Sequence, residues 1–310
     1  MTGHSAVVEV VTLSYKRQPA SVGPVPDESE QLAQVADVRR ACAAADGQDP
    51  LDEAAHLRLK HRGLAETVAA VTAEGFALLH EGQLDLAVAP EARGRGVGGS
   101  LAARVLEKDG LPVTAWSHGD HPAAARLADR LGFSRERELW VMRRPAGVPL
   151  PPVESPGGDS TGVTVRSFRP GDPLDAVAVL AVNAAAFASH PEQGAMDEAE
   201  LTERMAEEWF DPAGLLMAVD AEDELLGFHW TKQHDAERGE VYVVGIAPAA
   251  QGRGLGRVLT LAGLHHLVGL GVGEVILYVE SDNRPAVGLY GGLGFEHAAA
   301  DTHVQYRRSG

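Results

Sequence analysis

The sequence lacks the features that mark proteins of membranes, oxidising compartments or nucleic-acid complexes. Its single cysteine, Cys42, rules out an intrachain disulfide, so we expect a reducing, cytoplasmic location. No apolar run approaches the roughly 20 residues of a membrane span, and the amino terminus has no basic region followed by an apolar core. With 27 Lys and Arg against 44 Asp and Glu, the net charge of −17 argues against partners that are nucleic acids or anionic membranes.

What the sequence does contain is one pattern that occurs twice. The stretch Asp85–Gly99 reads DLAVAPEARGRGVGG, and Glu240–Arg257 reads EVYVVGIAPAAQGRGLGR. Arg93 corresponds to Gln251 (251 − 93 = 158), and further along the motif Leu-Gly-Phe occurs at residues 131–133 and again at 293–295 (293 − 131 = 162). The chain is therefore a tandem duplication.

Length and composition place the boundary between the copies. A chain of 310 residues is long enough for two cores, and prolines and glycines concentrate between Pro145 and Gly162. We predict an amino-terminal domain over residues 1–146, a linker over 147–162 and a carboxy-terminal domain over 163–310. The expected fold class is α/β, with a mixed central sheet flanked by helices in each copy.

Both copies show the same order of elements. An apolar strand runs into a glycine turn, and the turn opens a helix that leads to a second strand; strands joined in this way should pair in parallel. We also expect a helix over Met196–Trp209, closing strands over Glu138–Arg143 and His303–Arg307, and an extra strand over Val7–Ser14.

The glycine turns predict a phosphate site, because closely spaced glycines let backbone N–H groups approach an anion at a helix start. A nucleotide-hydrolase loop is excluded, since Gly256 is followed by Arg257 and not by Lys. A dinucleotide fingerprint fits the first copy only, and no acidic residue ends the following strand Val113–Trp116. We therefore treat that match, formed by Gly94, Gly96 and Gly99, as accidental.

The segments Arg93–Gly98 and Gln251–Gly256 resemble the acetyl-CoA loop of the GCN5-related N-acetyltransferase (GNAT) family, in the same structural context both times. The resemblance implies that acetyl-CoA is the cosubstrate, with its pantetheine arm along the strand backbone and its pyrophosphate on the loop amides. The implied contacts are Leu86, Ala87, Val88, Arg93, Gly94, Arg95, Gly96, Val97 and Gly98 in the first copy, and Val244, Gly245, Ile246, Gln251, Gly252, Arg253, Gly254, Leu255, Gly256 and Arg257 in the second.

The two copies differ in the groups that acetyl transfer needs. A carboxylate can accept the proton of the amine, and a tyrosine can act as an acid toward the departing thiolate. Glu240 and Tyr290 supply these groups in the second copy, whereas Gly82 (240 − 158) and Ala128 (290 − 162) replace them in the first. We expect a non-catalytic amino-terminal domain. Glu240 could also be a solvated strand end, and Tyr290 a packed aromatic.

Several long runs in the second copy resemble the mycothiol synthase family, tandem N-acetyltransferases that acetylate the cysteinyl amine of cysteinyl-glucosaminyl-inositol to complete mycothiol. These include GFHWTK at 227–232 and LYVESDN at 277–283. The resemblance implies acceptor contacts at Glu53, Glu192, Lys232, Glu240 and Tyr278, and further acetyl-CoA contacts at Asn283, Arg284, Pro285, Ala286, Val287 and Gly288. Gly288 departs from the Arg frequent in such helices, and Gly291 weakens the helix that carries Tyr290.

Other interpretations stay open at this point. The acceptor could be another amine, such as an aminoglycoside or a peptide amino terminus, or the chain could be a CoA-binding regulatory module. Glu192 and Lys232 could be solvated surface charges. We expect no metal, a monomer, and only small-molecule partners.

Overall fold

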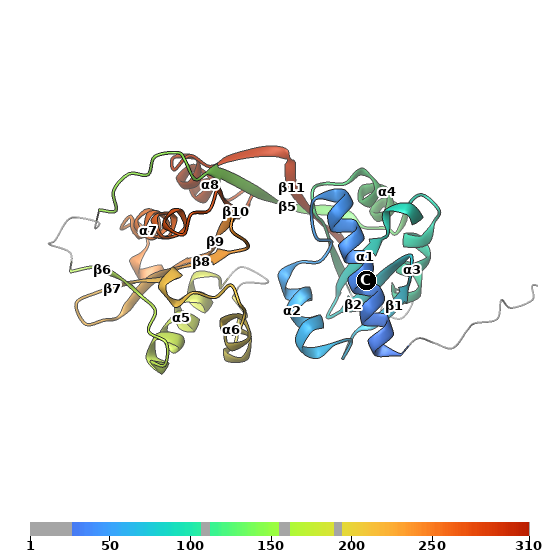
Figure 1. Cartoon of the computed structure of the whole chain (residues 1–310), viewed down its shortest axis with the longest axis horizontal. Coiled ribbons are helices and arrows are strands. Elements are labelled where there is room, and N and C mark those ends of the chain that lie inside the picture. The colour runs from blue at the N-terminus through green and yellow to red at the C-terminus, as the bar shows by residue number, and fades with distance from the viewer. Residues whose placement is uncertain (1–26, 107–111, 155–161, 189–193, 310) are drawn as a thin grey trace, which may run out of the picture.

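The computed structural model describes residues 27–106, 112–154, 162–188 and 194–309, so the strand expected over Val7–Ser14 lies outside the described range. The fold is mixed α/β, as the sequence predicts. One sheet of 11 strands runs through the described chain in the order β1-β2-β3-β4-β11-β5-β10-β9-β8-β7-β6, with helices on both faces (Figure 1). No helix in the described ranges is long and apolar enough to cross a bilayer.

The amino-terminal half comprises the elements from α1 to β5. Asp27 caps α1 by accepting a hydrogen bond from the backbone N–H of Glu30, and Gly47 ends the helix in a left-handed conformation. The elements of this half are α1 (Glu28–Asp46), α2 (Glu53–Arg62), β1 (Val68–Thr72), β2 (Gly75–His80), β3 (Gln83–Val88), α3 (Val97–Leu106), β4 (Val113–Ser117), α4 (Pro122–Arg130) and β5 (Ser134–Pro145).

The carboxy-terminal half comprises the elements from β6 to β11 and repeats the same plan. Its elements are β6 (Thr164–Ser167), α5 (Pro173–Ala186), α6 (Glu198–Met205), β7 (Leu215–Val219), β8 (Leu225–Gln233), β9 (Arg238–Ile246), α7 (Leu255–Gly269), β10 (Glu274–Glu280), α8 (Arg284–Gly291) and β11 (Glu296–Arg308). Helix α6 is shorter than predicted, because the chain turns after Met205 and packs Trp209 and Phe210 on the ring of Trp230.

The two halves exchange their last strands. Strand β11 of the carboxy-terminal half pairs with β4 of the amino-terminal half, from Val304 opposite Ser117 to Arg308 opposite Val113. Strand β5 of the amino-terminal half pairs with β10 of the other half, and β5 and β11 also pair with each other. Both exchanged strands are longer than predicted, and they bridge the two lobes in Figure 1. Each half therefore completes its sheet with a strand of the other.

Alternating side chains assign the helices to opposite faces of the sheet. In β2, Ala77 and Leu79 pack in a core with α3, while Phe76 and Leu78 pack in a core with α1 and α2. In the carboxy-terminal half, α7 and α8 share a core with β10, and α5 and α6 share another with Phe228 and Trp230 of β8. Each half thus presents its glycine-turn helix on one face and its first two helices on the other.

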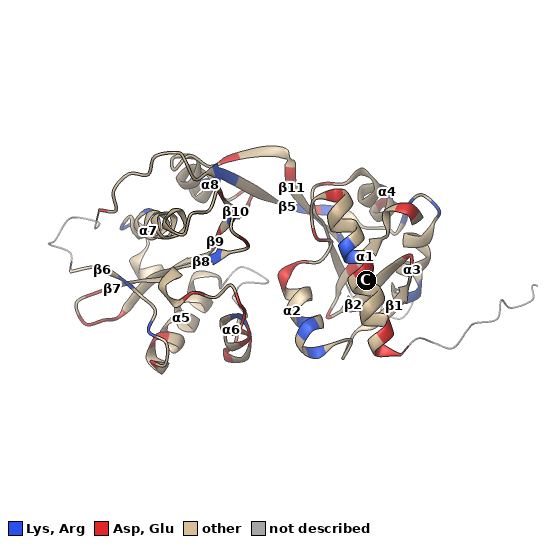
Figure 2. Cartoon of the chain, viewed as in Figure 1, with Lys and Arg blue, Asp and Glu red and all other residues tan. Residues whose placement is uncertain are grey.

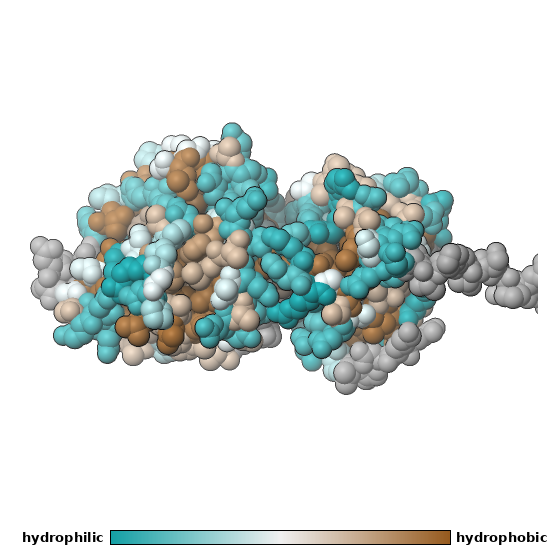
Figure 3. Space-filling model, turned by 60° about the horizontal axis from the view of Figure 1, so that its bottom comes forward, coloured by the Kyte–Doolittle hydropathy of each residue, from teal (hydrophilic) through white to brown (hydrophobic). Residues whose placement is uncertain are grey.

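The halves also meet through charged side chains of α2 and of the segment after α6. The Lys60 ammonium lies 2.8 Å from the Glu207 carboxylate, and Arg62 lies 3.4 Å from Glu203. Figure 2 shows basic residues at the end of α2 and acidic residues around α6, and the surface in Figure 3 is largely hydrophilic where the lobes meet. These exposed pairs orient the two lobes and contribute little stability, because solvent screens them.

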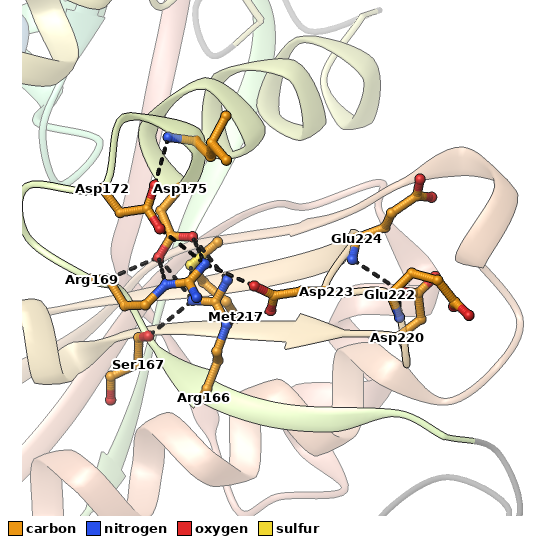
Figure 4. Close-up of polar contacts among 11 residues, drawn as sticks. Arg166, Ser167, Arg169, Asp172, Asp175, Met217, Asp220, Glu222, Asp223 and Glu224 are labelled. Atoms are coloured by element: carbon orange, nitrogen blue, oxygen red, sulfur yellow. Dashed lines mark hydrogen bonds and ion pairs between the residues drawn. The ribbon is translucent and has the colours of Figure 1, made fainter.

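A denser ion cluster fixes α5 to the sheet. The buried Asp175 carboxylate accepts hydrogen bonds from the guanidinium groups of Arg166 and Arg169, which also contact Asp223 in the β7–β8 turn (Figure 4). Burial raises the pKa of Asp175, but the two arginines more than offset this and hold that pKa well below its usual range. The cluster therefore joins β6, α5 and the turn as one charged unit.

Candidate active site

The site is built where strand β9 separates from β10. The two strands pair in parallel only as far as Val241 opposite Leu277, so the β10-facing edge of Val244–Ile246 has no strand partner among the described residues. On its other edge, β9 pairs with β8, and a bulge leaves Tyr242 without an opposite residue. The result is a V-shaped gap with an unpaired backbone edge, suited to an extended ligand with amide groups.

Beyond this edge, the glycine turn presents backbone N–H groups to solvent. Gly252 and Gly254 have φ angles of 75° and 80°, and the start of α7 follows directly. Across the described chain, none of the N–H groups of residues 252 to 256 donates a hydrogen bond to a protein acceptor. Free N–H groups at the start of a helix are an arrangement that favours anions.

Within this second loop, the predicted contacts divide into exposed and anchoring residues. Gln251, Arg253 and Arg257 are exposed and free to reach an anionic ligand, whereas the Leu255 side chain is 1% exposed and holds the loop in the core. In the neighbouring segment Asn283–Gly288, the side chain of Asn283 caps α8 by accepting from the N–H of Ala286. The helix forms despite its glycines.

The first glycine turn has the same backbone geometry but a different surrounding. Gly94 and Gly96 have φ angles of 75° and 85°, and β3 pairs with β4 only at Gln83 opposite Thr114, which leaves Leu86–Val88 unpaired on that side. Arg93, however, forms an ion pair with Asp46 and donates to the carbonyl oxygen of Val88. The equivalent of this arginine in the second copy is the uncharged, exposed Gln251.

The packing beneath the first turn is also tighter than beneath the second. A Cβ at Gly98 would lie 3.3 to 3.5 Å from the side chains of Val88, Leu127 and Leu86, whereas at Gly256 the nearest atom belongs to Leu289 at 3.8 Å. Arg95 in the first turn is also paired with Glu74. Two of the cations expected near the first loop are therefore engaged by carboxylates of the protein.

Lys232 and Glu53 come together although they are 179 residues apart in the sequence. The Lys232 ammonium contacts the Glu53 carboxylate on α2 and lies 4.6 Å from the ring centre of Trp209 and 5.3 Å from that of Tyr242. This lysine is 9% exposed, so two aromatic faces and one carboxylate replace most of its water. Both halves thus contribute to one cluster.

Glu240 lies directly opposite Lys232 on the paired strands and is buried, at 5% exposure. Its carboxylate oxygen Oε2 lies 2.6 Å from Nε2 of His234, in the turn between β8 and β9. Reasoning from the sequence missed His234. A polar residue in a polar turn gives no sequence signal of this contact, because the contact depends on the register of the hairpin.

Tyr278 follows the last paired residue of β10, so it stands at the fork of the V-shaped gap. Its ring lies 5.6 Å from that of His303, and 42% of the residue is exposed. Burial, and then the negative charge of Glu240, raise the pKa of its hydroxyl even though the residue is partly exposed. Tyr278 and Glu240 therefore act on the same region of the site.

Tyr290 lies on the face of the sheet that α7 and α8 cover, packed against the same core as Val244 of β9. It lies on α8, packs edge-on against Phe295 with ring centres 5.9 Å apart, and burial raises its pKa to about 12. The corresponding positions of the first half hold a turn glycine, Gly82 with φ 77°, and the buried Ala128. Neither can supply a proton acceptor or a donor.

The structure thus gathers Glu53, Lys232, Glu240 and Tyr278 around one end of the gap, while Glu192 falls outside the described residues. A cavity of about 630 Å³ lies nearby between α2 and α6, lined among others by Arg58, Gln83, Arg204 and Gln305. None of the expected acceptor contacts lines it. In the described ranges, no cluster of His, Cys, Asp or Glu is placed to hold a metal ion.

Comparison with solved structures agrees with this geometry at the level of the fold. A GCN5-related N-acetyltransferase from Sphaerobacter thermophilus superposes with a TM-score of 0.62 at 24% identity, over 91% of this chain and 93% of the other. A tandem GNAT protein from the clavulanic acid biosynthesis pathway gives a TM-score of 0.64 at 20% identity, over 91% and 95%.

Sequence comparison identifies the family. The model of the Acetyltransferase (GNAT) family matches residues 182–295. A mycothiol acetyltransferase from Nocardioides sp. (strain ATCC BAA-499 / JS614) is 60% identical, over 90% of this chain and 98% of the relative. Mycothiol acetyltransferases from Actinosynnema mirum and Nocardia farcinica are 48% and 46% identical, over 90% and 91% of this chain and 96% of each relative. The chain therefore belongs to the mycothiol acetyltransferase family, a tandem branch of the GNAT acetyltransferases.

Proposed function

We propose that this protein moves the acetyl group of acetyl-CoA to the cysteinyl amine of cysteinyl-glucosaminyl-inositol, the last step of mycothiol synthesis. Membership of the family supports the reaction. One structural observation carries the site. The open backbone edge of Val244–Ile246 leads into a turn with free N–H groups, and Glu240 lies one residue before Val241, the last residue of β9 that pairs with β10. Acetyl-CoA and the acceptor then approach the gap from opposite faces of the sheet.

Glu240 is the proposed base. An amine attacks only when it is neutral, so the acceptor's ammonium group must first lose a proton, directly or through a water molecule. The Glu240 carboxylate is buried beside the gap and its strand is fixed by β8 on one side and β10 on the other. A base held in this way contributes about 10²- to 10⁴-fold to the rate.

Tyr290 is the proposed donor to the departing thiolate. With its pKa raised to about 12, the hydroxyl stays protonated at neutral pH. Complete proton transfer to a thiolate whose conjugate acid has the usual pKa of about 8.5 would be uphill by about 3.5 units, or roughly 5 kcal/mol. Tyr290 therefore acts by donating a hydrogen bond as charge builds on sulfur, and solvent completes the protonation.

Glu53, Lys232 and Tyr278 are the proposed acceptor contacts, with Glu192 from outside the described range. A substrate with an ammonium group and many hydroxyls suits carboxylates, an ammonium and a phenol better than an apolar pocket. The acceptor's ammonium can compete with Lys232 for Glu53, which would release Lys232 toward hydroxyl oxygens. Because Glu53 comes from α2, we propose that the amino-terminal half contributes to the acceptor site without performing chemistry.

We also propose that only one of the two halves of the chain is catalytic. Residues 1–146 form the non-catalytic domain, 147–162 the linker and 163–310 the catalytic domain, in a monomeric cytoplasmic enzyme. Calorimetric titration with acetyl-CoA tests the role of the first loop. A single site that disappears in a Gly254→Val variant would mean that Arg93–Gly98 is empty, and a residual site would mean that both turns bind.

An acceptor assay tests the function itself. The purified protein is incubated with acetyl-CoA and, in separate reactions, the cysteinyl pseudodisaccharide, an aminoglycoside and a peptide with a free amino terminus, and the CoA thiol released is measured. We expect turnover with the pseudodisaccharide, and Glu240→Gln should lower kcat by about 10²-fold or more. The matched control Glu237→Gln, which changes an exposed residue of the same hairpin, should keep the wild-type kcat. Faster turnover of another amine would refute the assigned acceptor.

A further inference from the structure

We propose that His234 is a positioning residue for Glu240: its Nε2–H holds oxygen Oε2 of the carboxylate and leaves Oε1 to take the proton of the acceptor amine. The inference rests on the proposed role of Glu240 as the base. It adds a residue that no part of the sequence pattern pointed to, and it explains how a buried carboxylate keeps one orientation.

The contact between His234 and Glu240 is short and involves only one oxygen of the carboxylate. Nε2 of His234 lies 2.6 Å from Oε2 of Glu240, and no other hydrogen bond or ion pair of this carboxylate occurs in the described part of the chain. The Glu240 side chain is 7% exposed, whereas that of His234 is 31% exposed. An acceptor-only carboxylate requires a donor opposite it, so the ring carries its proton on Nε2 and turns Nδ1 away from Glu240.

The turn that carries His234 is held by its own hydrogen bonds. The Asp235 carboxylate accepts from the backbone N–H groups of Glu237 and Arg238, both at 2.8 Å, and the N–H of His234 donates to the carbonyl of Arg238 at 2.9 Å. These contacts close the hairpin between β8 and β9 around Asp235. These hydrogen bonds therefore hold the His234 imidazole in place beside Glu240.

Lys232, the nearest alternative partner, is engaged elsewhere. It lies opposite Glu240 in the strand register, but its ammonium contacts Glu53. Two charged or titratable groups interact with a member of this pair: Asp235 in the turn with His234, and Tyr278 on β10 with Glu240. Tyr278 also interacts with Arg143 on β5, Arg238 on β9 and Glu53 on α2. Within the described residues, only His234 forms a hydrogen bond or ion pair with the Glu240 carboxylate.

The proton balance follows from this arrangement. The acceptor's N–H bond breaks, its proton forms an O–H bond at Oε1, and the freed electron pair of the amine attacks the acetyl carbon. The Nε2–H of His234 stays on its nitrogen throughout.

Three variants test the proposal in the full-length protein with acetyl-CoA and the cysteinyl pseudodisaccharide. His234→Ala removes the donor, His234→Gln keeps an N–H donor, and His265→Ala is the control, since His265 bonds the Pro151 carbonyl away from the site. We expect His234→Ala to lower kcat about 10- to 100-fold, as for loss of a hydrogen bond to a charged group, with the KM for acetyl-CoA unchanged. His234→Gln should recover most of kcat, and His265→Ala should keep the wild-type kcat.

The outcomes separate this inference from the proposed function. Wild-type kcat in Glu240→Gln overturns the base itself and with it the role of His234. Wild-type kcat in His234→Ala, alongside a strong loss in Glu240→Gln, overturns the positioning role alone. If His234→Ala unfolds, His234→Gln decides: a kcat no better than that of Glu240→Gln contradicts the proposal.

Discussion

Gly263 lies where α7 packs tightly against the sheet, and replacing it by alanine should loosen this helix, which begins at the second glycine turn. An added Cβ would lie 2.0 Å from Cε1 and 2.2 Å from Nδ1 of His229, and 2.9 Å from the Thr231 side chain. His229 has no room to retreat, because it is fully buried and its Nδ1 is 2.8 Å from the Leu259 carbonyl oxygen. Either α7 must therefore move away from the sheet by more than about 1 Å, or the His229 imidazole must leave its buried position.

The expected change in the free energy of unfolding of Gly263→Ala is the sum of three contributions. Overpacking costs about 1–3 kcal/mol, and losing the buried hydrogen bond of His229 costs about 1–3 kcal/mol more. Alanine recovers roughly 1 kcal/mol of helix propensity. We expect Gly263→Ala to lower the free energy of unfolding by about 1–5 kcal/mol. Because α7 begins at the glycine turn, the KM for acetyl-CoA should rise as well.

Urea unfolding of two matched variants measures this effect. Gly269→Ala lies at the end of the same helix, where an added Cβ meets nothing within 4 Å, so it should be neutral or stabilising by up to about 1 kcal/mol. In a double-mutant cycle, His229→Ala should cost less in the Gly263→Ala background than in the wild type. Equal stability of Gly263→Ala and Gly269→Ala, or an absence of coupling with His229, would refute the close-packing argument.

Three further predictions concern the ends of the site and the sheet. Tyr290→Phe should lower kcat about tenfold or more while calorimetry shows unchanged acetyl-CoA binding; a wild-type kcat would exclude the donor role. Asp175→Asn should lower the free energy of unfolding at neutral pH and make it less dependent on pH, as measured by urea unfolding. The reason is that the lowered pKa of Asp175 contributes stability that is present above the unfolded pKa, near 3.9, and is lost as the pH falls below it. Residues 163–310 alone should expose the edge of β10 and aggregate, whereas restoring Ser134–Pro145 should improve solubility in sedimentation.

The fold was predictable from the sequence where local pattern and repetition agreed. The two glycine turns and the parallel strands on either side of each crossover helix are encoded within a few residues, and each appears where expected. The unequal copies were also visible, because Gly82 and Ala128 lack the functional groups whatever the fold does with them. Local chemistry was sufficient in these places.

The exchange of the last strands was not predictable in the same way. The predicted strands Glu138–Arg143 and His303–Arg307 lie inside β5 and β11, but their full lengths depend on pairing partners more than 100 residues away, which no local pattern reports. The contact between His234 and Glu240 was missed for a different reason. A polar residue in a polar turn gives no signal until the register of the hairpin is known.

The exchanged strands also set an order for folding during synthesis. Strand β4 ends at Ser117, whereas its partner β11 begins at Glu296, so β4 leaves the ribosome long before β11 is made. Until then β4 is an open edge, and an unprotected edge is where other chains add strands. The amino-terminal half thus becomes closed only after β11 has been made, so a premature stop near residue 295 would leave both halves incomplete at once.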